Sequence, residues 1–353
     1  MRLMPPLRRP AGGGPGGGRA AVVVTTVLCL VAGVSAGCAR RPDTSLHPDP
    51  PSVSYAPLRH PFAGARLYHD TDTAAARWQA AYGGYWLSPI TDRPQARWLT
   101  SPQDLADLPV LAANARQQDA LPVLVAYYLP NRGCTHHKDG APTERAYDHW
   151  IRRLLAALRP TRAAIVLEPD AVPADCFDAA RAKLLARTVK RLSAAGQYVY
   201  LDAGHSRWKS PGDVADRLLR SGIAYAEGFS VNVSNRQTIT DSYRWGRELS
   251  DLLGDRDFVI DTSRNGLGPP PHQSDGKEWC NPRRQGLGHP PTTRTRHRGL
   301  AALLWIKAPG ESDGRCGGET TYEFSPTQAR TLITKSPYVP ASYRRMAAAA
   351  PVP

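Results

Sequence analysis

Residues 198–205 read YVYLDAGH: four apolar or aromatic side chains are followed at once by an acid, two small residues and a histidine. Six more short apolar runs occur along the chain, and successive runs begin roughly 26 to 42 residues apart. The full set is Ala96–Leu99, Pro122–Tyr128, Ala163–Leu167, Tyr198–Leu201, Phe229–Val233, Phe258–Ile260 and Leu300–Ile306. Runs that are apolar along their whole length are typical of strands buried on both faces of a parallel sheet.

Helical patterns fill most of the gaps between these runs. The pattern in residues 210–219 begins with Ser210, a favourable capping residue, and has Pro211 at the first helical position. Asp213 lies in the first turn, and the pattern ends before Gly222. Strands that alternate with helices predict parallel pairing through right-handed crossovers.

Polar residues directly follow nearly every apolar run. They are Asn131, Arg132, Glu168, Pro169, Asp170, Asp202–His205, Asn232, Asn235, Asp261–Asn265, Lys307, Glu311 and Asp313. In an α/β barrel such residues converge on one mouth, where the chemistry takes place. The alternative, a doubly wound dinucleotide-binding sheet, needs a glycine-rich turn after its first strand, and the sequence has none there. We therefore predict an α/β fold, a distorted seven-stranded parallel β/α barrel.

The amino-terminal 37 residues have the composition of an export signal. They contain four arginines and no acid, and they continue as a largely apolar run over 20–37 that ends in small residues. The alternative is an uncleaved membrane anchor, because the run barely reaches the length of a bilayer-spanning helix. Cys38 follows Ser35-Ala36-Gly37, which resembles a bacterial lipoprotein cleavage box with Cys38 as the lipidated first residue. Ordinary cleavage after Ala36 is the competing interpretation.

The remaining chain divides into three parts. Residues 38–62 are rich in Pro, Asp, Ser and His without an apolar period, which predicts a flexible linker. Residues 63–335 hold the predicted barrel domain, and the Pro/Ala-rich stretch 336–353 is expected to be a disordered tail. We expect a monomer that is secreted, or anchored as a lipoprotein at the outer face of the cell membrane.

The net charge of +14 permits binding to a polyanion, and removing the four arginines of the signal region leaves 14 − 4 = +10. The basic residues are scattered along helical stretches, and no basic stripe with interleaved aromatic residues occurs. A solvated basic surface is therefore the better interpretation, and no nucleic-acid partner is expected. A basic envelope adhesin or nucleic-acid binder is the weakest competing hypothesis.

Four cysteines lie outside the signal region: Cys134, Cys176, Cys280 and Cys316. An even number in an exported chain predicts disulfide bonds, for which three pairings exist. None of the four belongs to a C-x-x-C pair or stands beside a suitably spaced histidine, so no metal site is expected. No cofactor motif is recognised either.

Seven stretches at the ends of the predicted strands carry a specific resemblance. They are AYYLPNRGC (126–134), VLEPDAV (166–172), YLDAGHSRW (200–208), FSVNVSN (229–235), VIDTSRNGLG (259–268), EWCNP (278–282) and LWIKAPGESDG (304–314). With these stretches in this order, the chain resembles glycoside hydrolase family 6, the inverting endoglucanases and cellobiohydrolases, over roughly residues 67–329. The resemblance implies a β-1,4-glucan or cello-oligosaccharide partner and disulfides Cys134–Cys176 and Cys280–Cys316.

Asp170 matches the family's general acid, which protonates the departing glycosidic oxygen. Asp313 matches the proposed general base for the attacking water, and inversion requires the two carboxyl groups to stand about 6.5–9.5 Å apart. The alternatives are a helix-capping role for Asp170 and a loop-turn role for Asp313.

The resemblance also implies a set of substrate contacts. Candidate polar contacts are Tyr127, Asp202, His205, Asn235, Lys307 and Glu311, and the candidate sugar-stacking platforms are Trp98, Trp208 and Trp279, with Thr100 nearby. Indole rings suit this role because the faces of a pyranose ring are apolar. The alternatives are core positions for Tyr127, His205 and the tryptophans, and a surface ion pair for Lys307 and Glu311.

One position departs from the family pattern. Its second strand end usually reads P-x-R-D-C, whereas this chain has Gly133 where the aspartate is expected. That aspartate is thought to raise the proton affinity of the acid and to relay a proton. Asp139, His136 and His137 are the candidates to replace it. A carbohydrate-binding pseudoenzyme is therefore the alternative function, and the short segments before Trp279 and after Asp313 favour an open, endoglucanase-type cleft.

Overall fold

The computed structural model describes residues 61–134, 140–271, 278–317, 319 and 323–351 of the 353-residue chain, all within one compact unit, Tyr55–Pro353. The predicted signal peptide, Cys38, residues 38–60 of the linker, and the replacement candidates His136, His137 and Asp139 lie outside the described residues. Among the described helices, none is long and apolar enough to cross a bilayer.

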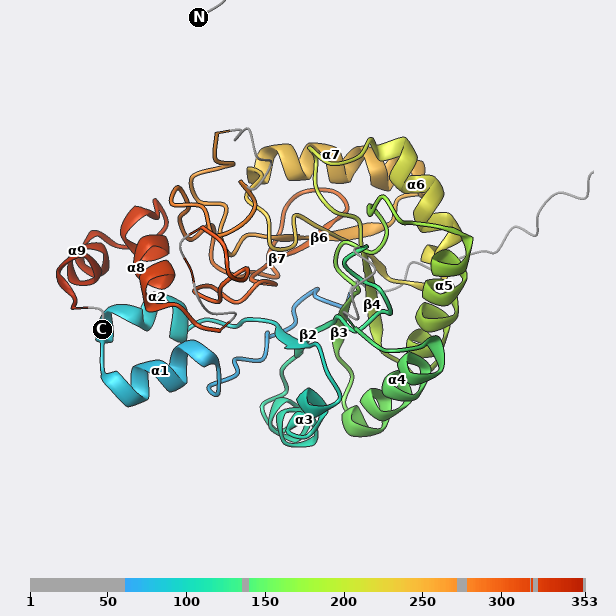
Figure 1. The fold of residues 1–353 in the computed structure, drawn as a ribbon, viewed down its shortest axis with the longest axis horizontal. Coiled ribbons are helices and arrows are strands. Elements are labelled where there is room, and N and C mark those ends of the chain that lie inside the picture. The colour runs from blue at the N-terminus through green and yellow to red at the C-terminus, as the bar shows by residue number, and fades with distance from the viewer. Residues whose placement is uncertain (1–60, 135–139, 272–277, 318, 320–322, 352–353) are drawn as a thin grey trace, which may run out of the picture. The chain divides into compact units, whose positions relative to one another are not determined.

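The described strands form one parallel sheet in sequential order (Figure 1). Its members are β1 (Arg97–Leu99), β2 (Val123–Ala126), β3 (Ala164–Leu167), β4 (Tyr198–Asp202), β5 (Gly228–Val231), β6 (Asp257–Asp261) and β7 (Leu300–Leu304). The seven predicted strands are confirmed. The sheet curls so that the backbone N–H of Ala96, before β1, donates to the carbonyl of Trp305, after β7, at 2.9 Å. The described edge strands share no ladder beyond this contact, so the barrel is distorted, as predicted.

Helices cover the outer face of the sheet, and a second group lies beside it (Figure 1). The covering helices are α3 (Leu108–Gln117), α4 (Glu144–Leu158), α5 (Ala179–Ala194), α6 (Pro211–Arg220) and α7 (Ile239–Leu252). The second group is α1 (Ala74–Tyr82), α2 (Ser88–Thr91), α8 (Pro326–Lys335) and α9 (Ala341–Ala349). The predicted start of α6 is confirmed, because the Ser210 side chain accepts a hydrogen bond from the backbone of Asp213.

Alternation along each strand separates two cores. On β4, Tyr200 points into the barrel, while Val199 and Leu201 pack beneath the helices, and all three are fully buried. Phe62 is also fully buried and its ring lies 5.6 Å from that of Tyr200. The predicted linker boundary is therefore slightly too late, because Phe62 already belongs to the interior of the barrel.

The prediction of a disordered tail over 336–353 is wrong for its described part, 336–351. Residues Ala341–Ala349 form helix α9, which packs on α8. Ala347 is fully buried and Val339 nearly so, in a third core that also contains Trp305. Composition misled the prediction because this tertiary contact orders a short Ala-rich helix that is marginal in isolation.

Candidate active site

A cleft of about 500 Å³ opens at the carboxyl ends of the strands. Its lining is Trp98, Tyr127, Pro169, Asp170, His205, Arg207, Trp208, Val233, Ser234, Asn235, Trp279, Lys307, Ser312 and Asp313. Segments after six of the seven strands contribute to it, which explains how residues far apart in sequence meet at one mouth. Both predicted catalytic carboxyl groups are among them, together with seven of the predicted substrate contacts.

Asp170 follows β3 in a left-handed backbone conformation, with φ = 70°. Its backbone N–H donates to the Asp202 carboxylate at 2.9 Å, so the strand end is fixed while the side chain reaches the cleft. Burial, and secondarily the negative charge of Asp313, raises the pKa of Asp170 to about 6. A carboxyl group with such a pKa keeps its proton in mildly acidic solution, as a general acid must.

Asp202 lies beneath the cleft and does not line it. Its side chain is fully buried and accepts hydrogen bonds from the backbone of Asp170, the backbone of Gly204 at 3.2 Å and the hydroxyl of Ser230 at 2.9 Å. Burial and the neighbouring Asp170 charge raise the pKa of Asp202 to about 7. This arrangement makes Asp202 a support for the strand end that carries Asp170, out of reach of a sugar in the cleft.

Asp313 has the opposite electrostatic surroundings. A terminal nitrogen of Arg264 lies 2.8 and 2.9 Å from its two carboxylate oxygens, and Arg236 approaches to 3.2 Å. Burial alone would raise the pKa of Asp313, but the two guanidinium groups outweigh it and hold the pKa well below its usual range. The cleft thus combines one carboxyl group that holds its proton with one carboxylate that stays ionised.

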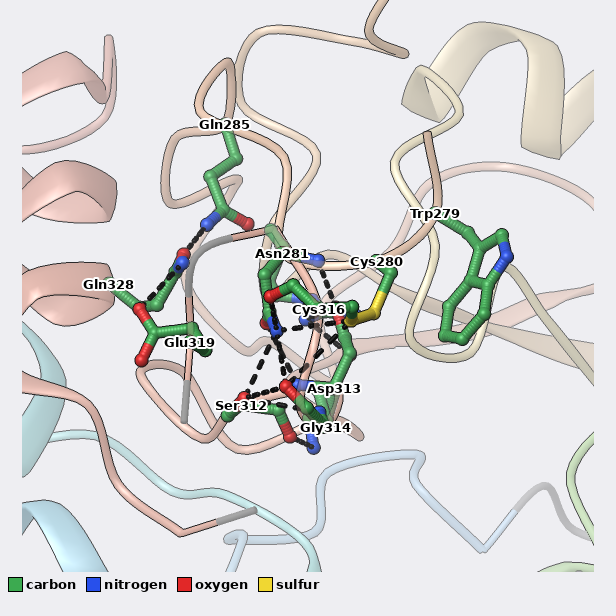
Figure 2. The surroundings of a disulfide bond; sticks show 12 residues. Trp279, Cys280, Asn281, Gln285, Ser312, Asp313, Gly314, Cys316, Glu319 and Gln328 are labelled. Carbon is green, nitrogen blue, oxygen red and sulfur yellow. Dashed lines mark hydrogen bonds and ion pairs between the residues drawn. A yellow bond between two sulfur atoms is a disulfide. The ribbon is translucent and has the colours of Figure 1, made fainter. Parts of the chain in front are cut away.

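The Cys280–Cys316 disulfide joins the segment carrying Trp279 to the segment carrying Asp313 (Figure 2). Asn281 reinforces the link, since its backbone N–H donates to the Asp313 carboxylate at 3.1 Å and its side-chain oxygen accepts from the Asp313 backbone at 2.8 Å. The predicted pairing is confirmed, as is the Cys134–Cys176 bond.

A buried carboxylate also organises the strand ends around Asp313. Asp261, at the end of β6, accepts backbone hydrogen bonds from Ser234, Ser263, Ile306 and Lys307, at 2.9 to 3.2 Å. It therefore joins the segments after β5, β6 and β7, from which Ser234 and Lys307 reach the cleft. The sequence had placed Asp261 at the mouth without revealing this structural role.

Aromatic rings line the rest of the cleft. Trp208 and Trp279 expose 36% and 53% of their surface, as stacking platforms require. Trp98 is fixed by a hydrogen bond from its indole nitrogen to the carbonyl of Ile306 at 2.7 Å, and its ring meets Tyr127 edge-on. His205 lies beside Trp208, and burial, with a contribution from Arg207, lowers its pKa to about 4, which leaves the imidazole neutral.

Two further predicted contacts fall outside the cleft lining. The backbone and hydroxyl of Thr100 both donate to the carboxylate of Asp104, so its side chain serves a local turn. Glu311 lies 3.9 Å from Lys307 in an ion pair, but the side chains are only 30% and 13% exposed and Lys307 lines the cleft, so this is not the surface pair of the alternative. Gly133 is exposed and does not line the cleft.

No sequence pattern predicted a role for Arg207, Arg236 or Asn281, and Arg264 was predicted only to lie at the mouth. Arg264 and Asn281 stand within the quoted stretches VIDTSRNGLG and EWCNP, but only the fold reveals that they hold Asp313. Among the described residues, no group of three or more His, Cys, Asp or Glu side chains is placed to hold a metal ion.

An open cleft with two carboxyl groups of opposite protonation and exposed indole rings is the arrangement of a glycoside hydrolase. Comparison with known proteins agrees: the model of the glycosyl hydrolases family 6 matches residues 63–339. The chain belongs to this family.

Individual relatives are similar over most of the domain. Endoglucanase A of Cellulomonas fimi is 40% identical over 262 residues, which are 71% of this chain and 57% of that protein. Endoglucanase 1 of Streptomyces halstedii is 37% identical over 76% of this chain and 88% of its own length. The solved structure of the endoglucanase Cel6 from Mycobacterium tuberculosis, in complex with methyl-cellobiosyl-4-deoxy-4-thio-β-D-cellobioside, is 37% identical with a TM-score of 0.71. It covers 76% of this chain and 97% of that one.

Proposed function

We propose that the protein is an inverting β-1,4-endoglucanase in which Asp170 is the general acid and Asp313 the general base. The observation that carries this proposal is the contrast in one cleft between an Asp170 pKa raised to about 6 and an Asp313 pKa held well below its usual range. Two carboxyl groups whose surroundings separate their pKa values in this way are suited to opposite proton transfers.

The proposed reaction is a single displacement. Asp170 donates its proton to the glycosidic oxygen as the bond from the anomeric carbon to that oxygen breaks. A water molecule attacks the anomeric carbon from the opposite face, and Asp313 accepts the proton that this water loses. The products are two shorter glucans, one of which has an inverted anomeric hydroxyl. Trp98, Trp208 and Trp279 supply apolar platforms for the sugar rings, while Tyr127, Asn235, His205 and Lys307 supply polar contacts.

Internal cutting is favoured over processive cutting from chain ends. The relatives at 37–40% identity are named endoglucanases, and the related Mycobacterium structure holds a cello-oligosaccharide analogue. Trp208 and Trp279 are exposed along the cleft, in keeping with a groove that admits a chain from the side.

We further propose that the protein acts outside the cytoplasm, either secreted or anchored through Cys38. Two disulfides and the basic, apolar amino-terminal sequence support export. Metabolic labelling with a clickable fatty acid tests the anchor: the wild type should be labelled and recovered with membranes. A Cys38→Ala variant should be unlabelled, and labelling of the variant would refute lipidation at this residue.

The presence of Gly133, which is exposed, supports a second candidate function, that of a carbohydrate-binding protein with little turnover. The substitution removes a carboxyl group from the loop after β2, and with it the proposed like-charge support of the acid. Burial and the charge of Asp313 still raise the pKa of Asp170 to about 6 without that group, which favours the active enzyme.

Hydrolysis of defined cello-oligosaccharides, with the product anomer followed by NMR, tests both candidates. The enzyme should release the α-anomer first, and Asp170→Ala should lower the rate by about 10²–10⁴-fold. Equal, background-level release by both proteins would leave only the binding function. An increased rate for Gly133→Asp would show that the missing carboxyl group limits turnover.

A further inference from the structure

Arg207 stands out among the cleft residues because its charge has no evident use in the proposed reaction. It lies in the turn after β4, between His205 and Trp208, and its side chain is exposed in the lining of the cleft. The turn itself is fixed: the backbone N–H of Trp208 donates to the carbonyl of His205 at 3.0 Å, and that of Arg207 lies 3.3 Å from the His205 imidazole.

The acids near this turn are engaged elsewhere. Asp313 is bound by two arginines, and Asp175, which follows β3, pairs with Lys209 at 2.7 Å. Asp170 holds its proton in the state that starts the reaction. Within the described part of the chain, the Arg207 guanidinium makes no ion pair, so it faces the cleft as an uncompensated cation.

The positive charge of Arg207 acts on its neighbours in the cleft. Arg207 contributes to the lowered pKa of the half-buried His205, whose ring lies 5.7 Å from Trp208. A sugar stacked on the Trp208 indole would therefore place its substituents near a guanidinium group. A guanidinium group binds carboxylates and other oxyanions through parallel, charge-assisted hydrogen bonds. A neutral sugar hydroxyl can accept a hydrogen bond from it but offers no ionic attraction.

We infer that Arg207 makes the cleft selective for glucans that carry acidic substituents, by pairing with an anionic group on the sugar bound at Trp208. This inference rests on the proposed glucanase function and names the substrate class for the same cleft. The net charge, which is still 14 − 4 = +10 without the four arginines of the signal region, acts in the same direction, since a basic surface concentrates an acidic polymer before it enters the cleft.

Two soluble celluloses of matched substitution and viscosity test the inference: carboxymethyl cellulose, which is acidic, and hydroxyethyl cellulose, which is neutral. The measured quantity is the ratio of kcat/KM on the acidic polymer to that on the neutral one. Arg207→Gln should lower this ratio by about fivefold. Salt at about 0.5 M should lower the wild-type ratio toward that of the variant, because it screens exposed charges.

Arg153→Gln is the matched control, because Arg153 is an exposed arginine on α4, outside the cleft lining, and the change in net charge is the same. The control should keep the wild-type ratio. If Arg207→Gln changes the rates on both polymers by the same factor, Arg207 serves neutral sugars or the fold, and the inference is overturned. If the control loses the ratio equally, the selectivity belongs to the net charge and the inference also fails.

Failure of the proposed function has a different signature. The wild type would then hydrolyse neither polymer. Affinity electrophoresis through gels containing each polymer would instead give a binding ratio, the affinity for the acidic polymer divided by that for the neutral one. A binding ratio that Arg207→Gln lowers and Arg153→Gln preserves would support selective recognition without turnover. An equal binding ratio in all three proteins would end the inference.

Discussion

Arg264 and Asp313 form an ion pair in which a terminal guanidinium nitrogen lies within 2.9 Å of both carboxylate oxygens, with side-chain exposures of only 3% and 8%. Arg236 places a second cation beside the Asp313 carboxylate, at 3.2 Å. This pairing keeps Asp313 ionised but also makes it a weak base, so in the proposed reaction the placement of the attacking water must contribute as much as the basicity of Asp313.

Replacing Arg264 by Gln should therefore change both stability and the pH profile. The variant leaves a buried carboxylate with one cation fewer, which costs about 3–5 kcal/mol of unfolding free energy. The pKa of Asp313 rises in the variant, so Asp313 becomes protonated and activity falls at a mildly acidic pH where the wild type is still active. The kcat/KM profile between pH 3.5 and 7, together with thermal unfolding, measures both effects.

Arg264→Lys is the control, because it keeps the positive charge while giving up the fixed guanidinium geometry. It should retain more of the activity at low pH than Arg264→Gln. An acidic limb at the same pH in all three proteins would mean that Arg264 does not govern the ionisation of Asp313.

The raised pKa of Asp170 should set the alkaline limit of the proposed activity. The general acid must be protonated in the free enzyme, so kcat/KM should fall about tenfold per pH unit above pH 6. Asp170→Asn should lower kcat by about 10²–10⁴-fold on cello-oligosaccharides. On an aryl β-cellobioside with a dinitrophenolate leaving group the loss should be much smaller, because that group departs without a proton. Equal losses on both substrates would contradict the role of Asp170 as acid.

Asp202 lies directly beneath the acid but should leave this limit in place. Its own pKa of about 7 keeps it largely protonated where Asp170 loses its proton, so Asp202→Asn removes little charge and the alkaline limb should stay near pH 6. The amide oxygen can still accept the hydrogen bond from the Asp170 backbone, which preserves the strand end. Ser230→Ala is the matched control, because it removes a neutral partner of Asp202. A limb that moves to lower pH in Asp202→Asn but not in Ser230→Ala would contradict this, because it would show that Asp202 is ionised beside Asp170 and raises the pKa of Asp170.

The strands and the mouth of the barrel could be predicted because their cause is local. Each run is apolar along its length, and parallel strands bring the residues that follow them to one end. Asp170, Trp208 and Asp313 were placed correctly at the cleft by this logic and by the family resemblance.

Other features depend on contacts that no local pattern encodes. Arg236 meets Asp313 across 77 residues of sequence and Arg264 meets it across 49, so their pairing is a property of the fold. Thr100 was expected near a sugar, but an acid four residues later captures its hydrogen bonds. The helix over 341–349 was missed because its stability comes from burial of Ala347 against a distant core.

The Cys280–Cys316 disulfide provides a test of how the two sides of the cleft are held together. In a Cys280→Ser, Cys316→Ser double variant, the chain-entropy model predicts a loss of about 2–4 kcal/mol of unfolding free energy. Asn281 still holds the backbone and carboxylate of Asp313, whereas Trp279 loses the covalent link beside it. KM on cello-oligosaccharides should therefore rise by a larger factor than kcat falls.

The Cys134→Ser, Cys176→Ser double variant is the control, since its disulfide does not adjoin Trp279 or Asp313. A dominant loss of kcat in the first variant would show instead that the disulfide positions the base, and that Asn281 is not sufficient to do so.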